Sequence, residues 1–290
     1  MRRNPNKIKK AKPERIVFGI VFVLFFFYAA LLLYPFLFAF VASLKDGSRD
    51  FMNNMISFPL PPKFSNYISA IQELEVGNSS FLEMTFNSIW FAAGTTCLGI
   101  FSSEMVAYVV CKYNFKLKNF FYGLSLFVMI IPIYGSLPAQ YRLFSQLGFM
   151  DSPSILLSYT GGFGYNFIII YSFFKGLSWS YAEAAFIDGA GHFRVFFSIM
   201  FPMAMPAVTA ITIIGFVGNW NDYLTPILYM EESYPTLASG IYSYEEKMKY
   251  LSDQPIYFAG VLLSMIPAVS IFVGFQNTIM QNVYAGGLKG

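Results

Sequence analysis

The sequence predicts an all-α, polytopic membrane protein. Of its 290 residues, 56% are hydrophobic and only 12% are charged, whereas a soluble domain carries roughly 25% charged residues. Apolar runs close to the roughly 20 residues that cross a bilayer as a helix recur along the whole chain. The Lys and Arg residues are distributed unevenly among the segments between these runs. These features exclude an ordinary soluble globular protein.

Six apolar runs are long enough to be membrane spans. The first is far longer than the roughly 7–15-residue apolar core of a cleaved signal and has no A-x-A site near its end, so we expect it to be retained. The third and sixth runs contain Pro132 and Pro267, which a helix packed in a bundle can tolerate. The predicted spans are residues 16–44, 84–111, 119–137, 155–174, 204–229 and 256–275. An apolar pattern at about 138–154 predicts a short interfacial helix.

The positive charges predict which side of the membrane each loop faces. Thirteen of the 19 Lys and Arg residues fall in the two tails and in the loops after the second and fourth spans. Because the side rich in Lys and Arg is cytoplasmic as a rule, we expect both termini in the cytoplasm, which agrees with an even number of spans. The predicted parts are a basic tail at 1–15, a six-helix domain at 16–275 and a cytoplasmic tail at 276–290. The position of the first tail directly before a span favours contact with membrane lipid over binding to nucleic acid.

The cysteines and the histidine predict no metal or cofactor site. Cys97 and Cys111 lie 14 residues apart in the second span, or about 21 Å along a helix, whereas a disulfide needs Cα atoms within about 7 Å. They form no metal-binding or redox motif. The single histidine, His192, is expected to be a surface or packing residue of a loop rather than a ligand or catalyst.

The most informative stretch, EAAFIDGAGHFRVFFSIMFPMAMP, runs from residue 183 to residue 206 between the fourth and fifth spans. Its first three residues favour a short helix of little bulk, with Glu183 near the start, where the helix dipole favours an acid. Asp188-Gly189 can turn the chain because glycine accepts a positive φ. The segment is therefore expected to form a helix followed by a tight turn.

The second half of this stretch leads into the fifth span. Phe193, Phe196 and Phe197 lie at spacings of three and four, which predicts one apolar stripe on a second short helix. Pro202 and Pro206 are expected to mark the start of the span, where a missing backbone donor costs least.

This segment resembles the coupling loop of bacterial ABC importer permeases, whose pattern is E-A-A, three residues, G, nine residues, I, one residue and L-P. Phe201 stands where the pattern has Leu. The resemblance implies a type I ABC importer permease fold, in which residues 175–203 couple the membrane protein to a cytoplasmic ATPase. The implied coupling residues are Glu183, Ala184, Ala185, Asp188, Gly189, Ile199 and Pro202.

Further stretches resemble the second permease subunit of the carbohydrate-uptake branch, the maltose-transporter type. Together they cover nearly all of the chain from the first span onward. The resemblance implies a sugar importer of the bacterial cytoplasmic membrane, and the Gly-Leu pair in the tail favours oligosaccharides over maltose itself. These stretches are Asn87-Ser88, Ala107-Tyr108 followed by Phe115, Trp220-Asn221-Asp222-Tyr223-Leu224 with Pro226, and the tail Ala285–Gly290.

The same resemblance implies the partners of the chain. A second, homologous permease subunit would complete the translocation path. A dimeric cytoplasmic ATPase would bind the coupling segment and approach the C-terminal tail. An extracytoplasmic solute-binding protein or lipoprotein would contact the outer loop at about 230–255. The chain contains no G-x-x-x-x-G-K-[ST] motif, so ATP and Mg belong to the ATPase and this chain is not expected to be an enzyme.

Two acids lie inside predicted spans, where a charge is costly. Asp222 belongs to a stretch that joins hydrogen-bonding groups to aromatic rings and could line a sugar path. Its amides and acid could equally form hydrogen bonds between helices, and the sequence leaves both interpretations open. Glu104 lies outside the family pattern, and a packed or protonated side chain is favoured for it. The candidate path residues are Asn219, Trp220, Asn221, Asp222 and Tyr223.

Two other functions compete with sugar import. The same scaffold could import a non-sugar solute such as an amino acid, although the stretch at 219–226 and the C-terminal tail favour sugar. An intramembrane enzyme would need clustered catalytic groups in the spans. Glu104 and Asp222, without a histidine nearby, are too few for that.

Overall fold

The structure is a computed structural model that describes residues 12–131, 133–230, 232–251 and 253–287. These residues form helices, with one isolated antiparallel bridge between Val76 and Ser79, which confirms the all-α fold class. In chain order the elements are α1 (Lys12–Ser43), α2 (Gly47–Asn53), α3 (Ser65–Glu73), α4 (Phe81–Lys112), α5 (Lys118–Ile130), η1 (Ile133–Ser136), α6 (Leu137–Leu147), η2 (Pro153–Tyr159), α7 (Tyr165–Gly176), α8 (Ser180–Ile187), α9 (His192–Val195), η3 (Phe196–Met200), α10 (Phe201–Trp220), α11 (Leu224–Tyr229), α12 (Leu237–Leu251) and α13 (Gln254–Gly287).

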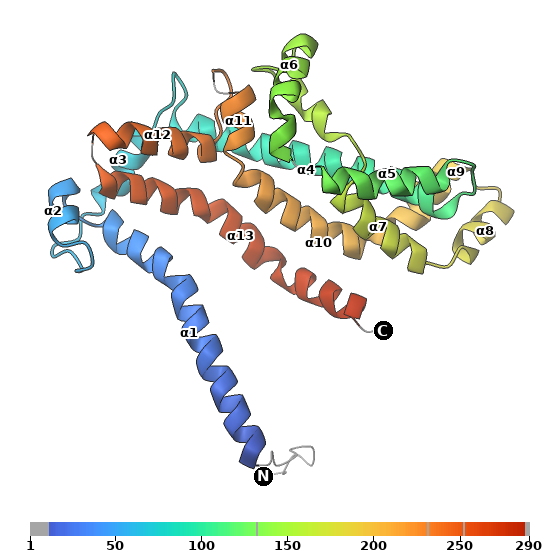
Figure 1. Cartoon of the computed structure of the whole chain (residues 1–290), viewed down its shortest axis with the longest axis horizontal. Coiled ribbons are helices and arrows are strands. Elements are labelled where there is room, and N and C mark those ends of the chain that lie inside the picture. The colour runs from blue at the N-terminus through green and yellow to red at the C-terminus, as the bar shows by residue number, and fades with distance from the viewer. Residues whose placement is uncertain (1–11, 132, 231, 252, 288–290) are drawn as a thin grey trace.

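The bundle is organised around α4. Helices α4, α10 and α13 run along the long axis of the molecule, with α2, α3 and α12 at one end and α8 and α9 at the other (Figure 1). α4 begins at Phe81 because Ser80 and Glu83 form a capping box, in which each side chain accepts a hydrogen bond from the other residue's backbone N–H. An apolar core between α4, α7 and α10 includes Phe167 and Val208.

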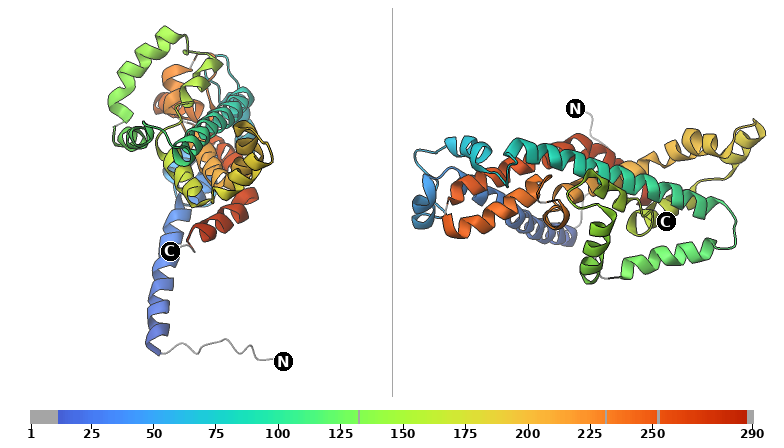
Figure 2. Two further views of the ribbon diagram at one scale, coloured as in Figure 1. Left: turned by 90° about the vertical axis from the view of Figure 1, so that its right-hand side faces the viewer. Right: turned by 90° about the horizontal axis from the view of Figure 1, so that it is seen from above.

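α1 stands apart from this bundle (Figures 1 and 2). The side chains of residues 16–37 are all exposed, and the helix becomes buried only near its end, at Ala39 and Ala42. There Phe38 packs against Phe258 of α13, with ring centroids 5.6 Å apart. A helix this apolar on all sides needs lipid or another apolar chain around it.

Four described helices are long and apolar enough to cross a membrane: Ile16–Ser43, Phe81–Lys112, His192–Trp220 and Gln254–Gln276. The predicted third and fourth spans are not single long helices. α5 has 13 residues and α7 has 12, which correspond to about 20 Å and 18 Å of helix, against about 30 Å of hydrocarbon. The count of six spans therefore stays a prediction, and so does the cytoplasmic position of both termini.

The third predicted span is interrupted at a proline. The sequence predicts one helix through Pro132, whose own placement lies outside the described residues. The structure ends α5 at Ile130 and gives Ile131 an extended ψ of 123°. The cause is local, because the ring of a proline clashes with a helical residue before it.

The last two predicted spans differ from the structure in their bounds. The sequence predicts a fifth span at 204–229, but one continuous helix runs from His192 to Trp220, through the π-helical turn η3. The predicted second short helix is thus the first part of this span. Residues 221–223 lie in a break before α11. The predicted sixth span lies in α13, which passes Pro267 and continues to Gly287, beyond the predicted end of the span at 275.

The tails lie partly outside the described residues. Of the basic tail at 1–15, residues 1–11 are outside them, and so are residues 288–290 of the predicted family-like tail Ala285–Gly290. α6 confirms the predicted short helix after residue 137, and the predicted loop at about 230–255 contains α12.

A buried lysine holds the segment that follows α1. Lys45 is fully buried, and its Nζ donates to the carbonyl oxygens of Asn54 at 2.5 Å and Ser57 at 2.8 Å. Nearby, the exposed Lys63 Nζ lies 2.6 Å from a carboxylate oxygen of Asp46. The hydrogen bond and the charge of Asp46 raise the pKa of Lys63 above its ordinary value.

Candidate functional site

The predicted coupling segment forms a helix that ends in a Schellman motif. Gly189 adopts a φ of +81°, and its N–H donates to the Phe186 carbonyl at 3.0 Å. The Ala190 N–H donates to the Ala185 carbonyl at 2.9 Å. These are the two hydrogen bonds of a Schellman motif with glycine in the left-handed position, which closes the carbonyl end of α8. The predicted turn at Asp188-Gly189 is confirmed.

α8 and the turn that follows it form a hairpin, which is held in place by the end of α4. Lys112 Nζ donates to the Leu177 carbonyl at 2.6 Å, just before α8. The Tyr113 hydroxyl lies 2.8 Å from Nδ1 of His192, just after the turn. Trp179 packs against Tyr113 with ring centroids 5.8 Å apart. His192 thus has the packing role that the sequence predicts, and both ends of the segment are bonded to one helix.

The surface that the segment presents to solvent contains most of the implied coupling residues. Glu183 and Ala184 on α8, and Asp188 and Gly189 in the turn, are exposed, whereas Ala185 is half-buried. Beside them, the side chain of Ile187 is 86% exposed. A projecting helix with an acid, small residues and one large apolar side chain has the features of a protein contact surface.

Ile199 and Pro202 occupy a different place from the other five. Ile199 lies in η3 and packs against the α4–α7–α10 core, and Pro202 lies at the start of α10. In η3 the Phe201 N–H donates to the Phe196 carbonyl, five residues back. These two positions therefore belong to the helix that leads away from the hairpin.

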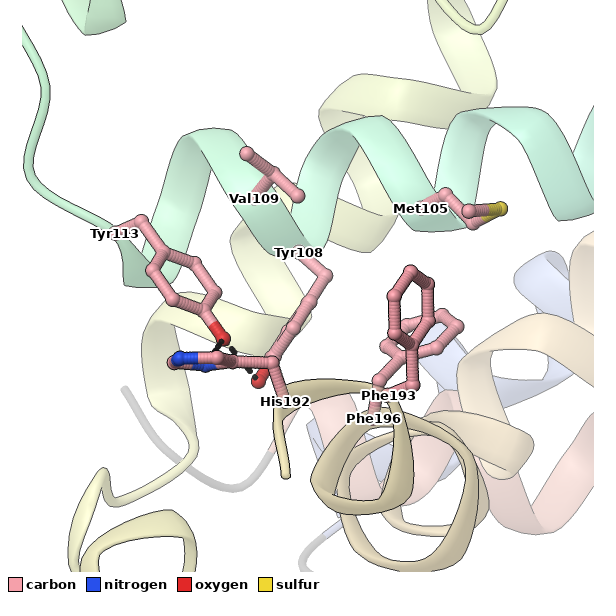
Figure 3. A pocket seen from close by; sticks show the side chains of 7 residues that line it. All are labelled: Met105, Tyr108, Val109, Tyr113, His192, Phe193 and Phe196. Atoms are coloured by element: carbon pink, nitrogen blue, oxygen red, sulfur yellow. Dashed lines mark hydrogen bonds between the residues drawn. The ribbon is translucent and has the colours of Figure 1, made fainter. Parts of the chain in front are cut away.

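The predicted phenylalanine stripe is divided between two environments. Phe196 is buried and packs on Tyr108, with ring centroids 5.0 Å apart, whereas Phe193 is 75% exposed. Both line an apolar cavity of about 270 Å³ between α4 and α9, together with Met105, Val109 and others (Figure 3). Phe197 packs on Phe196, with ring centroids 5.0 Å apart, and on Phe101 of α4 at 6.2 Å. The three rings of the predicted stripe therefore lie toward α4, with Phe193 the most exposed of them.

A polar cleft lies at the other end of α10. One cavity of about 610 Å³ is formed by α6, η2, the end of α10 and α11. A second cavity of about 350 Å³ is formed by α4, the segment before α7, and α10. Both are lined by Ser158, Tyr159 and Asn219, so they adjoin. We call the two together the polar cleft.

Four of the five candidate path residues line the polar cleft. Asn219, Asn221, Asp222 and Tyr223 lie on the wall of its larger cavity. Asn219 Nδ2 also donates to Oγ1 of Thr96 at 2.9 Å, so hydrogen bonding between helices and cleft lining coexist at this residue.

Trp220 lies elsewhere. Its side chain is only 3% exposed, and its Nε1 donates to the Ser264 carbonyl of α13 at 3.0 Å. Trp220 therefore joins α10 to α13 and is not among the residues that line the cleft. The aromatic surface there comes from Tyr223, whose ring stacks on that of Tyr242 at 4.8 Å and 17°.

Several polar residues of the cleft escaped the sequence analysis. The signal for some of them was present, because Thr96, Gly99 and Ser103 recur at spacings of three and four and so share one face of α4. Gln140 and Asn166 come from separate helices and carry no such pattern. The cleft residues missed are Thr95, Thr96, Gly99, Ser103, Gln140, Ser158, Tyr159, Asn166 and Tyr229.

Glu104 lies outside the cleft. It is fully buried, and neither carboxyl oxygen has a hydrogen-bond partner among the described residues. It shares a face of α4 with Ile100 and Tyr108, which belong to the core against α7 and α10. Cys97 and Cys111 are both unpaired thiols. Among the described residues, no group of His, Cys, Asp or Glu could hold a metal ion.

The fold and these two sites define a class of protein. Long apolar helices, the projecting α8 hairpin at one end of the bundle and a polar cleft beside the middle of α4 are typical of a membrane transport subunit. The match to a family model is more specific, and it covers residues 96–283. The chain belongs to the family described as binding-protein-dependent transport system inner membrane component. It is an inner-membrane permease component of a bacterial ABC transport system and not an enzyme, because ATPase activity in such systems lies in a separate partner.

Individual relatives match over almost the whole chain. The diacetylchitobiose uptake system permease protein NgcG of Streptomyces coelicolor is 26% identical over 96% of this chain and 91% of the relative. The arabinooligosaccharides transport system permease protein AraQ of Bacillus subtilis is 28% identical over 96% and 98%. The sn-glycerol-3-phosphate transport system permease protein UgpE of Yersinia enterocolitica is 31% identical over 89% and 91%.

A solved structure shows the same fold. It is the crystal structure of a bacterial ABC transporter involved in the import of the acidic polysaccharide alginate, and one of its chains matches with a TM-score of 0.72 and 22% identity. The match covers 93% of this chain and 99% of that chain.

Proposed function

We propose that this chain is the permease subunit of an ATP-driven, binding-protein-dependent importer of sugars, in particular oligosaccharides. Two of the relatives named above are permeases for diacetylchitobiose and for arabinooligosaccharides. The observation that carries the proposal for this chain is the polar cleft, where the amides of Asn219 and Asn221 lie beside the exposed Tyr223 ring. A sugar offers hydroxyl groups for such amides and flat apolar faces for such a ring.

The hairpin of α8 and the following turn is the proposed contact with the ATPase. Within the coupling segment 175–203, the exposed Glu183, Ala184, Asp188 and Gly189 would face a cleft of the ATPase, with the half-buried Ala185 behind them. The bonds from Lys112 and Tyr113 support this role, since a contact that transmits movement must be rigidly joined to the membrane domain. Ile199 and Pro202 would connect the contact to the fifth span.

The remaining parts follow from the same proposal. Residues 16–275 form the membrane domain, with cytoplasmic tails at 1–15 and 276–290. A second, homologous permease subunit completes the path, and a dimeric cytoplasmic ATPase supplies ATP and Mg. A solute-binding protein or lipoprotein contacts the outer segment 230–255. Membrane lipid surrounds the chain, and no nucleic acid is involved.

Reconstitution of the complete system tests the function. The permease pair, ATPase and binding protein are placed in proteoliposomes, and ATP-dependent uptake is measured with diacetylchitobiose, arabinotriose and a panel of amino acids. Uptake of at least one oligosaccharide and of no amino acid is the expected result. Uptake of amino acids alone would replace the sugar assignment with the non-sugar alternative, while leaving the transport class intact.

A further inference from the structure

We propose that the polar cleft selects neutral oligosaccharides over anionic ones, and that Asp222 is the residue that determines this selection. The inference rests on the proposed function and adds to it the charge class of the cargo. Similarity to known proteins does not determine the charge of the cargo. The relatives include a permease for a phosphate ester beside two for neutral oligosaccharides, and the solved structure belongs to an importer of an acidic polysaccharide.

Among the described residues of the cleft wall, one has a carboxyl side chain and none has a basic one. This acid is Asp222, and no Lys or Arg is among the described residues that line the two cavities. The other polar groups are hydroxyls and amides, such as those of Gln140, Ser158 and Asn166. Proteins that recognise phosphate or carboxylate groups supply Arg or Lys for them, and this wall has none.

The charge of Asp222 is held at a defined place and is not neutralised by an ion pair. Its Oδ1 accepts a hydrogen bond from the Thr225 N–H at 3.1 Å, which fixes the carboxylate in the break between α10 and α11. No Lys or Arg is among the described residues that line the two cavities, and the ion pair between Lys63 and Asp46 lies elsewhere. An anionic cargo in the larger cavity would therefore meet an uncompensated negative charge within a few ångströms.

The same cavity offers contacts that suit a neutral sugar. The Tyr223 ring, stacked on Tyr242, provides a flat apolar surface. Asn221 is exposed and donates one amide bond to the Val217 carbonyl at 2.8 Å, which leaves its amide oxygen available to a sugar hydroxyl.

Direct binding to the purified permease–ATPase complex, without the binding protein, tests the inference. The neutral probes are diacetylchitobiose and arabinotriose, and the anionic probes are the uronates made from them by oxidation of one primary hydroxyl. Titration calorimetry gives the ratio of Kd values for each pair. We expect the uronate to bind at least about tenfold more weakly, because two like charges a few ångströms apart in a partly buried site repel strongly.

Two variants separate the role of Asp222 from a general effect of charge. Asp222→Asn keeps an oxygen for the Thr225 N–H, so the break should keep its shape while the Kd ratio falls toward one. Glu75→Gln removes an exposed acid that lines neither cavity, and it should leave the ratio unchanged. Raising the salt concentration from 0.05 to 0.5 M should lower the ratio of the two Kd values in the unmodified complex but not in the Asp222→Asn complex.

The outcomes distinguish this inference from the proposed function. Equal binding of both members of a pair, or a ratio that Asp222→Asn does not change, would overturn selection by Asp222 and leave sugar import standing. If no probe binds, the cleft is not a sugar site and the inference falls. The uptake assay of the complete system then decides separately whether the proposed function falls with it.

Discussion

The left-handed glycine at the end of α8 provides the sharpest test of the proposed coupling surface. Gly189 has a φ of +81°, and a Cβ added there would meet no heavy atom of this chain within 4 Å. A substitution at this position therefore has a conformational cost but no steric clash inside the chain. Residues with a Cβ pay about 1–2 kcal/mol in the left-handed region, whereas Asn is tolerated there far better.

Three variants separate the conformational cost from bulk. Gly189→Ala adds little volume, Gly189→Val adds a branched side chain, and Gly189→Asn adds volume with a smaller conformational cost. A cost of 1–2 kcal/mol shifts the equilibrium of the turn by about 5- to 30-fold. Because an eight-residue helix has little stability of its own, we expect uptake to fall about tenfold for Ala and further for Val, but to stay within about threefold for Asn.

The assay is ATP-dependent uptake in proteoliposomes, with the amount of permease in the membrane and the ATPase retained during purification measured in parallel. All three variants should reach the membrane, since Gly189 is exposed and outside the helical core. Normal uptake by the Val variant would refute the coupling role of the turn. Greater damage from Asn than from Ala would refute the conformational reasoning and indicate contact of the side chain with the partner instead.

Further predictions concern stability. Lys45→Met leaves two carbonyl groups without their buried donor, so it should lower the free energy of unfolding by about 2–4 kcal/mol, and an unchanged Tm would contradict this role. Glu104→Leu removes a buried carboxyl group without a partner and should raise the stability by about 1–3 kcal/mol; a lower Tm would mean that the group is bonded in the assembled complex. Asp46→Asn should lower the free energy of unfolding by less than about 1 kcal/mol, because the ion pair with Lys63 is exposed. The pKa of Lys63 is raised above 10.5 in the folded state, so this difference should persist from pH 7 to 10 and vanish as the pH rises through the raised pKa, as thermal melts at several pH values would show.

The features that depend on local chemistry were predictable from the sequence. The turn at Gly189 follows from a property of glycine alone, and α4 begins within three residues of the predicted second span. The breaks at Ile131 and Asn221 were not predictable from apolar runs, because hydrophobicity continues across them while the backbone does not. Local conformation, including the effect of the following proline at Ile131, determines these breaks.

The polar cleft could not be predicted from the sequence, because tertiary structure brings its residues together. Gln140, Asn166 and Asn219 lie on three helices, and each alone looks like an ordinary polar residue in a hydrophobic segment. Trp220 shows the opposite case, since its neighbours in sequence line the cleft while its own ring points to α13. α10 ends at Trp220, so the residues that follow it point in other directions. The sequence does not show where this helix ends.

The continuity of the helix from His192 to Trp220 has a mechanical consequence. Its 29 residues correspond to about 43 Å of helix, with the proposed coupling turn before one end and the polar cleft at the other. No loop intervenes that could absorb a displacement. If the α8 turn is the proposed contact with the ATPase, a displacement of the turn along this axis would reach the cleft as a shift of Asn219, less what the π-helical turn at Phe196–Met200 absorbs by changing its register. The π-helical turn and Pro206, which lies inside α10, are two places where this helix departs from regular α-helical hydrogen bonding. Under the proposed contact with the ATPase, these two places determine how much of a displacement of the α8 turn arrives at the cleft.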